Sequence, residues 1–281
     1  MLLRNVKYAC GVCRICFISH LITDQIFHND RRSLFHILRK QNISPSQLIF
    51  NLTDFFFSFT IGVTNFTPKG KKNMKVLMFN GSPHQKGCTY TALCEVQKEL
   101  DAAGIESEIM WVGADAVRSC TACEVCKTFA DHHCVIDDKV NEALVKAREC
   151  DAYVFGSPVH YAAPAGAMIA FMGRFLYAKE ELHCGKLGAA VVSCRRAGAT
   201  AALSVLNEFI TYGSIQPVAS QYWPMVHGNR PEEVLQDAEG LQIMRTLGKN
   251  IAWRLKMKKL AEENGLEAPD YEERVFTNFI R

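Results

Sequence analysis

The sequence of 281 residues lacks the features of a membrane-spanning or secreted protein. It has no run of roughly 18 uninterrupted apolar residues, which a transmembrane helix needs. The nearest run, residues 48–63, is interrupted by Asn51 and Asp54. The basic N-terminus does not make a signal peptide, because the apolar stretch after it is broken by Arg14 and His20 and no small-residue cleavage site follows. The sequence therefore predicts neither a membrane-spanning helix nor a secretory signal peptide.

The composition excludes several further classes of protein. Apolar residues make up 48% of the chain and charged residues 22%, and the mean hydropathy is −0.02. A chain disordered along its length, a collagen and a coiled-coil rod are therefore excluded. The twelve cysteines lie in local clusters and are not spread as a disulfide framework. This pattern favours a reducing, cytoplasmic location and a metal or redox use of some thiols.

Acidic residues and alanine are scarce in residues 1–73. This segment has ten Lys/Arg, three Asp/Glu, no glutamate and one alanine, a net charge of +7, whereas residues 74–281 carry −4. The purine-rich codons that can encode residues 70–73 would resemble a ribosome-binding site before Met74. We therefore expect Met74 to be the natural start and residues 1–73 to be an upstream in-frame translation; the alternative is a genuine but poorly packed extension. The mildly acidic remainder lacks the basic field of a nucleic-acid-binding protein.

After Met74, short apolar runs alternate with helical patterns, as in a parallel, doubly wound α/β sheet of five strands. Ligands of such sheets bind beyond the carboxyl ends of the strands. Three loops are therefore expected to meet at one site. The predicted strands are residues 75–80, 105–112, 152–155, 187–193 and 216–220, and the predicted helices are residues 89–103, 140–149, 164–177, 201–212 and a long last helix with residues 241–255 on one stripe.

The first of these loops, Gly81 to Thr89, is a glycine-bearing turn before a helix. Free N–H groups and the positive end of the helix dipole at such a place suit a phosphate group. The loop has neither the Gly-Lys-Ser/Thr of a P-loop nor the Gly-x-Gly-x-x-Gly of a dinucleotide site, so it suggests a mononucleotide monophosphate. The alternative is an ordinary strand–helix turn with Thr89 as the N-cap.

The second and third loops carry aromatic and cationic side chains. In the second, Gly156-Ser-Pro-Val-His-Tyr161, small residues would let the backbone approach a flat ligand, on which His160 and Tyr161 could stack; aromatic residues at a strand end are otherwise core or rim. In the third, residues 193–198, Arg195 and Arg196 could face an anion or be solvated surface charges.

Together these loops resemble the NAD(P)H-dependent FMN reductase family of flavodoxin-like proteins, over nearly all of residues 74–281. The resemblance implies a three-layer flavodoxin-like fold with bound FMN. In such relatives an Asp-Arg pair commonly follows the second loop's helix, and this chain has Gly173-Arg174 instead, without the aspartate. The resemblance assigns the FMN phosphate to Ser82, Gln85, Lys86, Gly87, Cys88 and Thr89, one side of the flavin ring to Pro158, Val159, His160 and Tyr161, and its other side to the loop with Ser193, Arg195, Arg196 and Gly198.

Four closely spaced cysteines form the pattern C-x2-C-x2-C-x7-C. Such thiolates can hold a [4Fe–4S] cluster, or a zinc ion with His132 or His133 replacing one ligand. The motif resembles that of iron–sulfur flavoproteins, and the alternative is a reduced, partly buried thiol-rich loop. The cysteines concerned are Cys120, Cys123, Cys126 and Cys134.

The resemblance implies hydride transfer from NAD(P)H to FMN and on to an acceptor, with no catalytic side chain because the flavin carries the chemistry. The expected acceptors are a quinone, a nitroaromatic compound, free flavin or, through a cluster, a one-electron partner such as ferredoxin. The family also implies a homodimer or homotetramer. Two alternatives remain open: a flavodoxin-like electron carrier without nicotinamide activity, and a zinc-binding cysteine-loop module.

Overall fold

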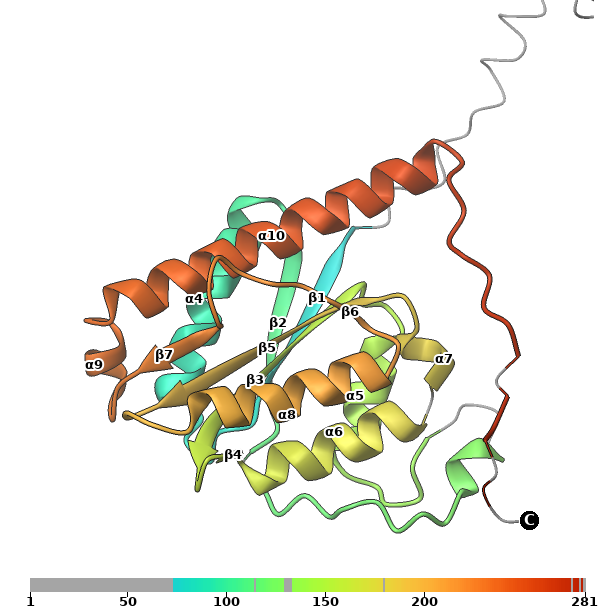
Figure 1. The fold of residues 1–281 in the computed structure, drawn as a ribbon, viewed down its shortest axis with the longest axis horizontal. Coiled ribbons are helices and arrows are strands. Elements are labelled where there is room, and N and C mark those ends of the chain that lie inside the picture. The colour runs from blue at the N-terminus through green and yellow to red at the C-terminus, as the bar shows by residue number, and fades with distance from the viewer. Residues whose placement is uncertain are drawn as a thin grey trace, which may run out of the picture. The chain divides into compact units, whose positions relative to one another are not determined.

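A computed structural model describes residues 73–113, 115–128, 133–178, 180–273, 275–277 and 279 of the chain (Figure 1). The predicted N-terminal extension therefore lies, except for Asn73, outside the described residues, and so does His132. The elements are β1 (Lys75–Asn80), α4 (Cys88–Ala102), β2 (Glu106–Trp111), η1 (Val125–Lys127), α5 (Lys139–Ala147), β3 (Ala152–His160), β4 (Ala163–Pro164), α6 (Gly166–Ala178), α7 (Glu180–His183), β5 (Leu187–Cys194), α8 (Ala199–Tyr212), β6 (Gln216–Pro217), β7 (Met225–His227), α9 (Pro231–Val234) and α10 (Ala238–Glu263).

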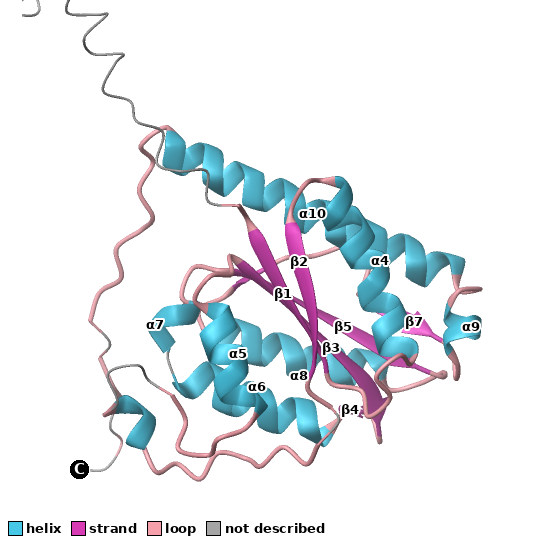
Figure 2. Cartoon of the chain, turned by 180° about the vertical axis from the view of Figure 1, so that it is seen from behind, coloured by secondary structure: helices cyan, strands magenta, loops and turns pink. Residues whose placement is uncertain are grey.

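The parallel strands follow the order β2-β1-β3-β5-β6, the order of flavodoxin-like sheets. Strand β7 also pairs with β5, and β4 pairs antiparallel with β3. Helices α4 and α10 cover one face of the sheet and α5, α6 and α8 cover the other, as Figure 2 shows from behind. The prediction of a three-layer, doubly wound flavodoxin-like fold is confirmed.

Strand β3 lies at the centre of the sheet because its side chains are apolar on both faces. Ala152 and Val154 pack under α4 and α10, while Tyr153 and Phe155 point into the aromatic cluster under α6. All four side chains are buried. A strand that is covered on both sides has a continuous apolar sequence, which is why residues 152–155 could be predicted as a strand.

Strands β3 and β5 extend farther than their sequence indicates. The predicted loop from Gly156 continues as strand to His160, because β5 pairs with it as far as Pro158 opposite Ser193. Strand β1 ends opposite Gly156, so Ser157 and Pro158 form an edge of β3 without β1, before β4 pairs with Val159 and His160. A proline, which has no N–H to donate, is tolerated at such an edge. The loop prediction at Gly156–His160 was therefore wrong.

Helix α10 packs along α4 through its predicted apolar stripe, whose members are buried. The two helices approach most closely at Gly248, where an added Cβ would lie 2.7 Å from the carbonyl oxygen of Val96. The opposite side of α10 is largely polar and exposed. Neither α10 nor any other helix among the described residues is long and apolar enough to cross a membrane.

Candidate functional site

The three predicted loops meet at the carboxyl ends of β1, β3 and β5. The N–H of Gly81 donates to the carbonyl of Gly156 at 2.8 Å, which joins the first loop to the second. The hydroxyls of Thr89 and Ser193 lie 2.8 Å apart, which joins the first loop to the third. At Gly198 an added Cβ would lie 2.8 Å from the backbone of the turn after β3. The structure therefore brings all three loops together.

The first loop is held in shape by side chains at its base. Asn80 accepts a hydrogen bond from the Ser82 N–H at 3.1 Å and donates one to the carbonyl of Gln85 at 2.9 Å. The Ser82 hydroxyl accepts from the N–H of His84 at 3.1 Å, and the Trp111 indole donates to the Ser82 carbonyl at 2.8 Å. Because these contacts fix the backbone, the loop is organised before a ligand arrives.

Helix α4 begins at this loop without a side-chain cap. Its N-cap is Gly87, which makes no capping hydrogen bond, so the predicted alternative with Thr89 as the N-cap is wrong. The N–H groups of the first helical turn have no acceptor within the helix, and the dipole there favours an anion. Gly87 and Cys88 are half-buried, and Lys86 is exposed beside them. This part of the loop fits a phosphate group.

Thr89 does not point its side chain toward the loop surface. The residue is fully buried, and its hydroxyl is bonded to that of Ser193, which is also buried. The hydroxyl of Thr89 is therefore directed toward the third loop, and the phosphate contact predicted for Thr89 stays a prediction.

Cys88 is a packed thiol at the same helix end. Burial raises the pKa of Cys88, and Glu233 and Glu232 raise it further. Its Sγ lies 3.5 Å from the Gly228 carbonyl, in a turn that also donates from the Gly228 N–H to the Cys194 carbonyl at 3.0 Å. Residues 227–230 thus form a fourth segment at this site, which the sequence marked only by a glycine after a short apolar run.

The second loop ends in a strained turn that exposes an aromatic ring. Strands β3 and β4 pair as His160 with Ala163, so Tyr161 and Ala162 form a two-residue turn, with φ values of 49° and 60°. Such a turn suits Asn or Gly, and a bulky residue there costs about 1–3 kcal/mol. Tyr161 is fully exposed. Strain of this kind is typical of functional sites.

The third loop presents two cations at the same edge. Arg195 and Arg196 are exposed, and within the part of the chain that the structure describes neither makes an ion pair. The preceding residue, Cys194, is buried in β5, and burial raises the pKa of its thiol. The loop therefore offers positive charge beside the turn of Tyr161, as the interpretation of this loop as an anion site requires.

The four predicted cysteines line a second hollow, beside α6. Between the first three of them, Ala122 and Glu124 have φ values of 52° and 58°, in the left-handed region that non-glycine residues rarely adopt. Alternating backbone conformations of this kind point successive N–H groups inward and are found around phosphates and iron–sulfur centres. The residues lining the hollow include Cys120, Cys123, Cys126, Cys134, Arg174 and Tyr177.

Hydrogen-bond donors face the sulfur atoms of this hollow. The Ala122 N–H donates to the Sγ of Cys120 and the Arg174 Nε to that of Cys134, both at 3.4 Å. The Val125 N–H and then the Thr121 side chain lower the pKa of Cys123. Such donors stabilise thiolates, the form that binds metal. The residues therefore fit a negatively charged, thiolate-ligated group.

The two predicted occupants of the hollow, a zinc ion and a [4Fe–4S] cluster, require different arrangements of the thiolates. A zinc ion needs its thiolate ligands at about 2.3 Å from one point. In the described segments no three His, Cys, Asp or Glu side chains converge closely enough to hold one ion. A [4Fe–4S] cluster is held by four cysteines, one on each iron, so their sulfurs need not meet at a point.

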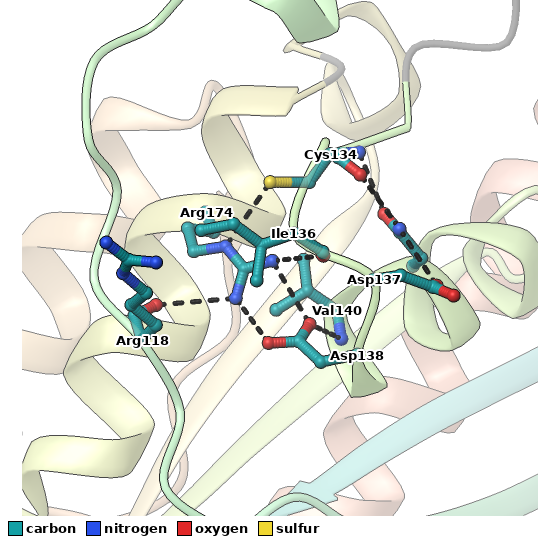
Figure 3. A network of polar contacts seen from close by, with 8 residues as sticks. Arg118, Cys134, Ile136, Asp137, Asp138, Val140 and Arg174 are labelled. Atoms are coloured by element: carbon teal, nitrogen blue, oxygen red, sulfur yellow. Dashed lines mark hydrogen bonds and ion pairs between the residues drawn. The ribbon is translucent and has the colours of Figure 1, made fainter.

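Arg174 has a carboxylate partner that the sequence pattern did not reveal. The residue before it is Gly173, where relatives commonly have an aspartate. The guanidinium of Arg174 forms its ion pair with Asp138 instead, at 2.5 Å (Figure 3). Burial opposes the charge of Arg174, whereas its hydrogen bonds to Asp138 and Cys134 raise its pKa. Arg174 thus has an aspartate partner although Gly173 lacks a carboxylate, and this partner lies 36 positions earlier in the chain.

Known proteins resemble the chain in sequence and in fold. An iron–sulfur flavoprotein of Methanocaldococcus jannaschii is 29% identical over 199 residues, which cover 66% of this chain and 100% of that protein. An iron–sulfur flavoprotein of Archaeoglobus fulgidus is 29% identical over 187 residues, covering 66% of this chain and 82% of that protein.

In fold, the chain is similar to an NAD(P)H:quinone oxidoreductase from Methanothermobacter marburgensis. The TM-score is 0.50 at 16% identity, covering 64% of this chain and 96% of that one. The family model described as NADPH-dependent FMN reductase matches residues 74–230, more than half of the chain and all three loops of the first site. The protein is therefore a flavoprotein oxidoreductase that belongs to the NADPH-dependent FMN reductase family.

Proposed function

We propose that the protein binds FMN across the three loops, takes hydride from NAD(P)H and delivers electrons to a one-electron acceptor, with a [4Fe–4S] cluster in the cysteine hollow. When bound, FMN supplies the change from two-electron to one-electron chemistry, and a cluster supplies single-electron exchange. The convergence of an uncapped helix end, an exposed tyrosine and two exposed arginines at one edge of the sheet carries the proposal.

The first loop would bind the phosphate of FMN. The N–H groups around Gly87 and Cys88 supply donors, Lys86 supplies a positive charge, and the Ser82 hydroxyl can donate its proton while it accepts from His84. Asn80 and Trp111 hold the backbone of Ser82, and the His84 N–H holds its hydroxyl oxygen, so this side chain is positioned before binding. This arrangement orients the ligand by its phosphate and leaves its ring toward the other two loops.

The second and third loops would hold the flavin ring. The turn of Tyr161 supplies an aromatic face, and the backbone from Pro158 to His160, which lies beyond the end of β1, leads into this turn and would line the ring. Arg195 and Arg196 give the opposite side a positive field, which favours both an anionic reduced flavin and the phosphates of a nicotinamide nucleotide. No side chain is required to transfer a proton in the hydride step.

The four cysteines would hold the cluster. The two left-handed residues of the loop and the N–H donors to sulfur support a thiolate-ligated group. The names of the Methanocaldococcus jannaschii and Archaeoglobus fulgidus relatives, which call them iron–sulfur flavoproteins, support the same assignment. A cluster makes a one-electron partner such as ferredoxin the favoured acceptor, whereas a chain without one would reduce a quinone, a nitroaromatic compound or free flavin.

The experiment is the visible spectrum of the full chain purified without oxygen, with assays of flavin, iron and sulfide. We expect about one FMN and four iron atoms per chain, and bleaching of the flavin bands by NADPH or NADH. FMN-loaded protein that NAD(P)H does not reduce would refute the reductase and favour an electron carrier. Colourless protein with zinc and no flavin would refute both assignments.

The phosphate assignment has its own test in FMN titration. Ser82→Ala removes one donor from the loop and should weaken FMN binding about 10- to 100-fold, because a hydrogen bond to a charged group contributes about 1.5–3 kcal/mol. Ser220→Ala is a matched control, since its hydroxyl donates to the carbonyl of Ile243 in α10, outside the three loops of the site. Equal FMN dissociation constants for the wild type and Ser82→Ala would contradict the assignment.

A further inference from the structure

Arg174 is a charged residue in the interior whose every donor is used. Its side chain is almost completely buried, on the face of α6 that points to the cysteine hollow (Figure 3). A guanidinium has five N–H groups, and this one makes five contacts. They are Nε to Cys134 Sγ at 3.4 Å, one terminal nitrogen to the Arg118 carbonyl at 3.3 Å and Asp138 at 2.5 Å, and the other to the Ile136 carbonyl at 2.7 Å and Asp138 at 3.1 Å.

These five contacts join both ends of the cysteine loop. Arg118 lies two residues before Cys120, and Ile136 lies two residues after Cys134. One side chain from α6 therefore fixes the place where the loop enters and the place where it leaves. Because a buried charge is costly unless it is paired and hydrogen-bonded, a residue that only filled space here would be apolar.

All three polar atoms of Cys134, its N–H, its carbonyl oxygen and its sulfur, have hydrogen-bond partners. Its N–H donates to the Asn141 side chain at 2.8 Å, and its carbonyl accepts from the same amide at 2.9 Å. Arg174 holds the third polar atom, the sulfur. Cys134 follows the other three cysteines after a gap of seven residues, so its position relative to them depends on contacts of this kind.

We propose that Arg174 is a positioning residue for a [4Fe–4S] cluster on the four cysteines, and that it raises the reduction potential of the cluster through the Nε–H···S contact with Cys134. This inference rests on the proposed function. One-electron reduction adds one negative charge to the cluster and its thiolates, with the electron supplied by the reduced flavin or by dithionite. A donor hydrogen and a positive charge at a ligand sulfur stabilise the more negative state, so they favour reduction.

A substitution of Asp138 provides a second test, because it should shift the reduction potential in the opposite direction. Its carboxylate faces the same guanidinium and offsets part of its charge, while one of its oxygens accepts from the Val140 N–H at the start of α5. Asp138→Asn keeps the cap, because asparagine caps helices as well as aspartate does, and removes the negative charge. Loss of the Arg174 fork and loss of the Asp138 charge should therefore move the potential in opposite directions, which a merely structural role of the pair would not do.

The test is an anaerobic redox titration of the full-length wild type, Arg174→Lys and Asp138→Asn, followed by the spectrum of the reduced cluster. Lysine keeps the charge but has no Nε–H at this place and no fork. We expect the equilibrium constant for reduction to fall about tenfold in Arg174→Lys, or about 59 mV for a one-electron couple, and to rise in Asp138→Asn. Arg245→Lys, whose ion pair with Glu95 lies on the other face of the sheet, should leave it unchanged.

Each outcome decides the inference. An unchanged potential in iron-loaded Arg174→Lys, or shifts of the same sign in both variants, would overturn it. If Arg174→Lys does not fold or take up iron, Asp138→Asn decides alone, and the absence of a rise overturns the inference. Failure of the proposed function would give a different result. Wild-type protein that binds FMN but takes up no iron and sulfide on reconstitution would refute the assignment of a cluster to the four cysteines.

Discussion

Acidification between pH 6.5 and pH 4 should destabilise the protein through one buried histidine. His183, in the short helix α7, is fully buried against Tyr153 and Phe175. Burial lowers the pKa of His183 from 6.5 to about 4, although its hydrogen bond with the Phe175 carbonyl opposes the shift. Because a carbonyl only accepts, Nε2 donates to it at 2.9 Å, and Nδ1 accepts from the Tyr153 hydroxyl at 3.3 Å. The neutral ring thus satisfies both partners.

The direction of the stability change follows from the pKa of His183 in the folded protein and in the unfolded chain. Between pH 4 and pH 6.5 the unfolded chain binds a proton at His183 that the folded protein does not, so stability rises with pH across this window and is lost on acidification. A difference of about 2.5 pKa units corresponds to about 3 kcal/mol in full, of which about 2.5 kcal/mol should be lost between pH 7 and pH 4.5. This is a large fraction of the stability of an ordinary domain.

The assay is urea unfolding of the wild type and His183→Gln at pH 7, 6, 5.5, 5 and 4.5, with saturating FMN. Glutamine retains a donor and an acceptor but does not titrate in this range. The wild type should start more stable and lose about 2.5 kcal/mol more than the variant by pH 4.5. Carboxylates titrate in both proteins and cancel in the difference. A difference that stays flat from pH 7 to pH 4.5 would refute the reasoning.

Three further predictions concern Tyr161, Gly248 and Cys123. Tyr161→Asn should stabilise the flavin-free protein by about 1 kcal/mol in urea, because asparagine tolerates a positive φ, and should weaken FMN binding by removing the ring; unchanged affinity would contradict the role of Tyr161. Gly248→Val should cost about 1–3 kcal/mol, because its Cβ would meet the Val96 carbonyl, and an unchanged urea midpoint would show that α10 can move away. Cys123→Ser should lose iron and sulfide while keeping FMN; retained iron would show that Cys123 is not a ligand.

The sequence predicts the parts of the fold that depend on neighbours along the chain. Residues 76–79 are apolar without a break because the strand is covered on both faces. Asp138 caps α5 and Gly104 ends α4 with φ of 73°, both local choices that a reader of the sequence can recognise. Such signals are sufficient to predict that the three loops lie at one edge of the sheet.

Features that depend on contacts distant in the chain could not be predicted in this way. The extension of β3 past Gly156 follows from pairing with β5, which overrides the turn signal of a glycine and a proline. The inward turn of the Thr89 hydroxyl depends on Ser193, 104 positions later. The carboxylate partner of Arg174 is not its neighbour in the chain but Asp138, at the start of another helix.

Helix α6 connects the two sites with a fixed length. It begins at Gly166, just after the turn of Tyr161, and carries Arg174 eight residues later, about 12 Å along the axis at 1.5 Å per residue. The separation between the turn of Tyr161 and the thiol hollow is thus set by the number of residues in a stiff helix. Adding one residue to this stretch would rotate the guanidinium by about 100° around the axis, so the distance between the two places can change only together with the direction in which Arg174 points.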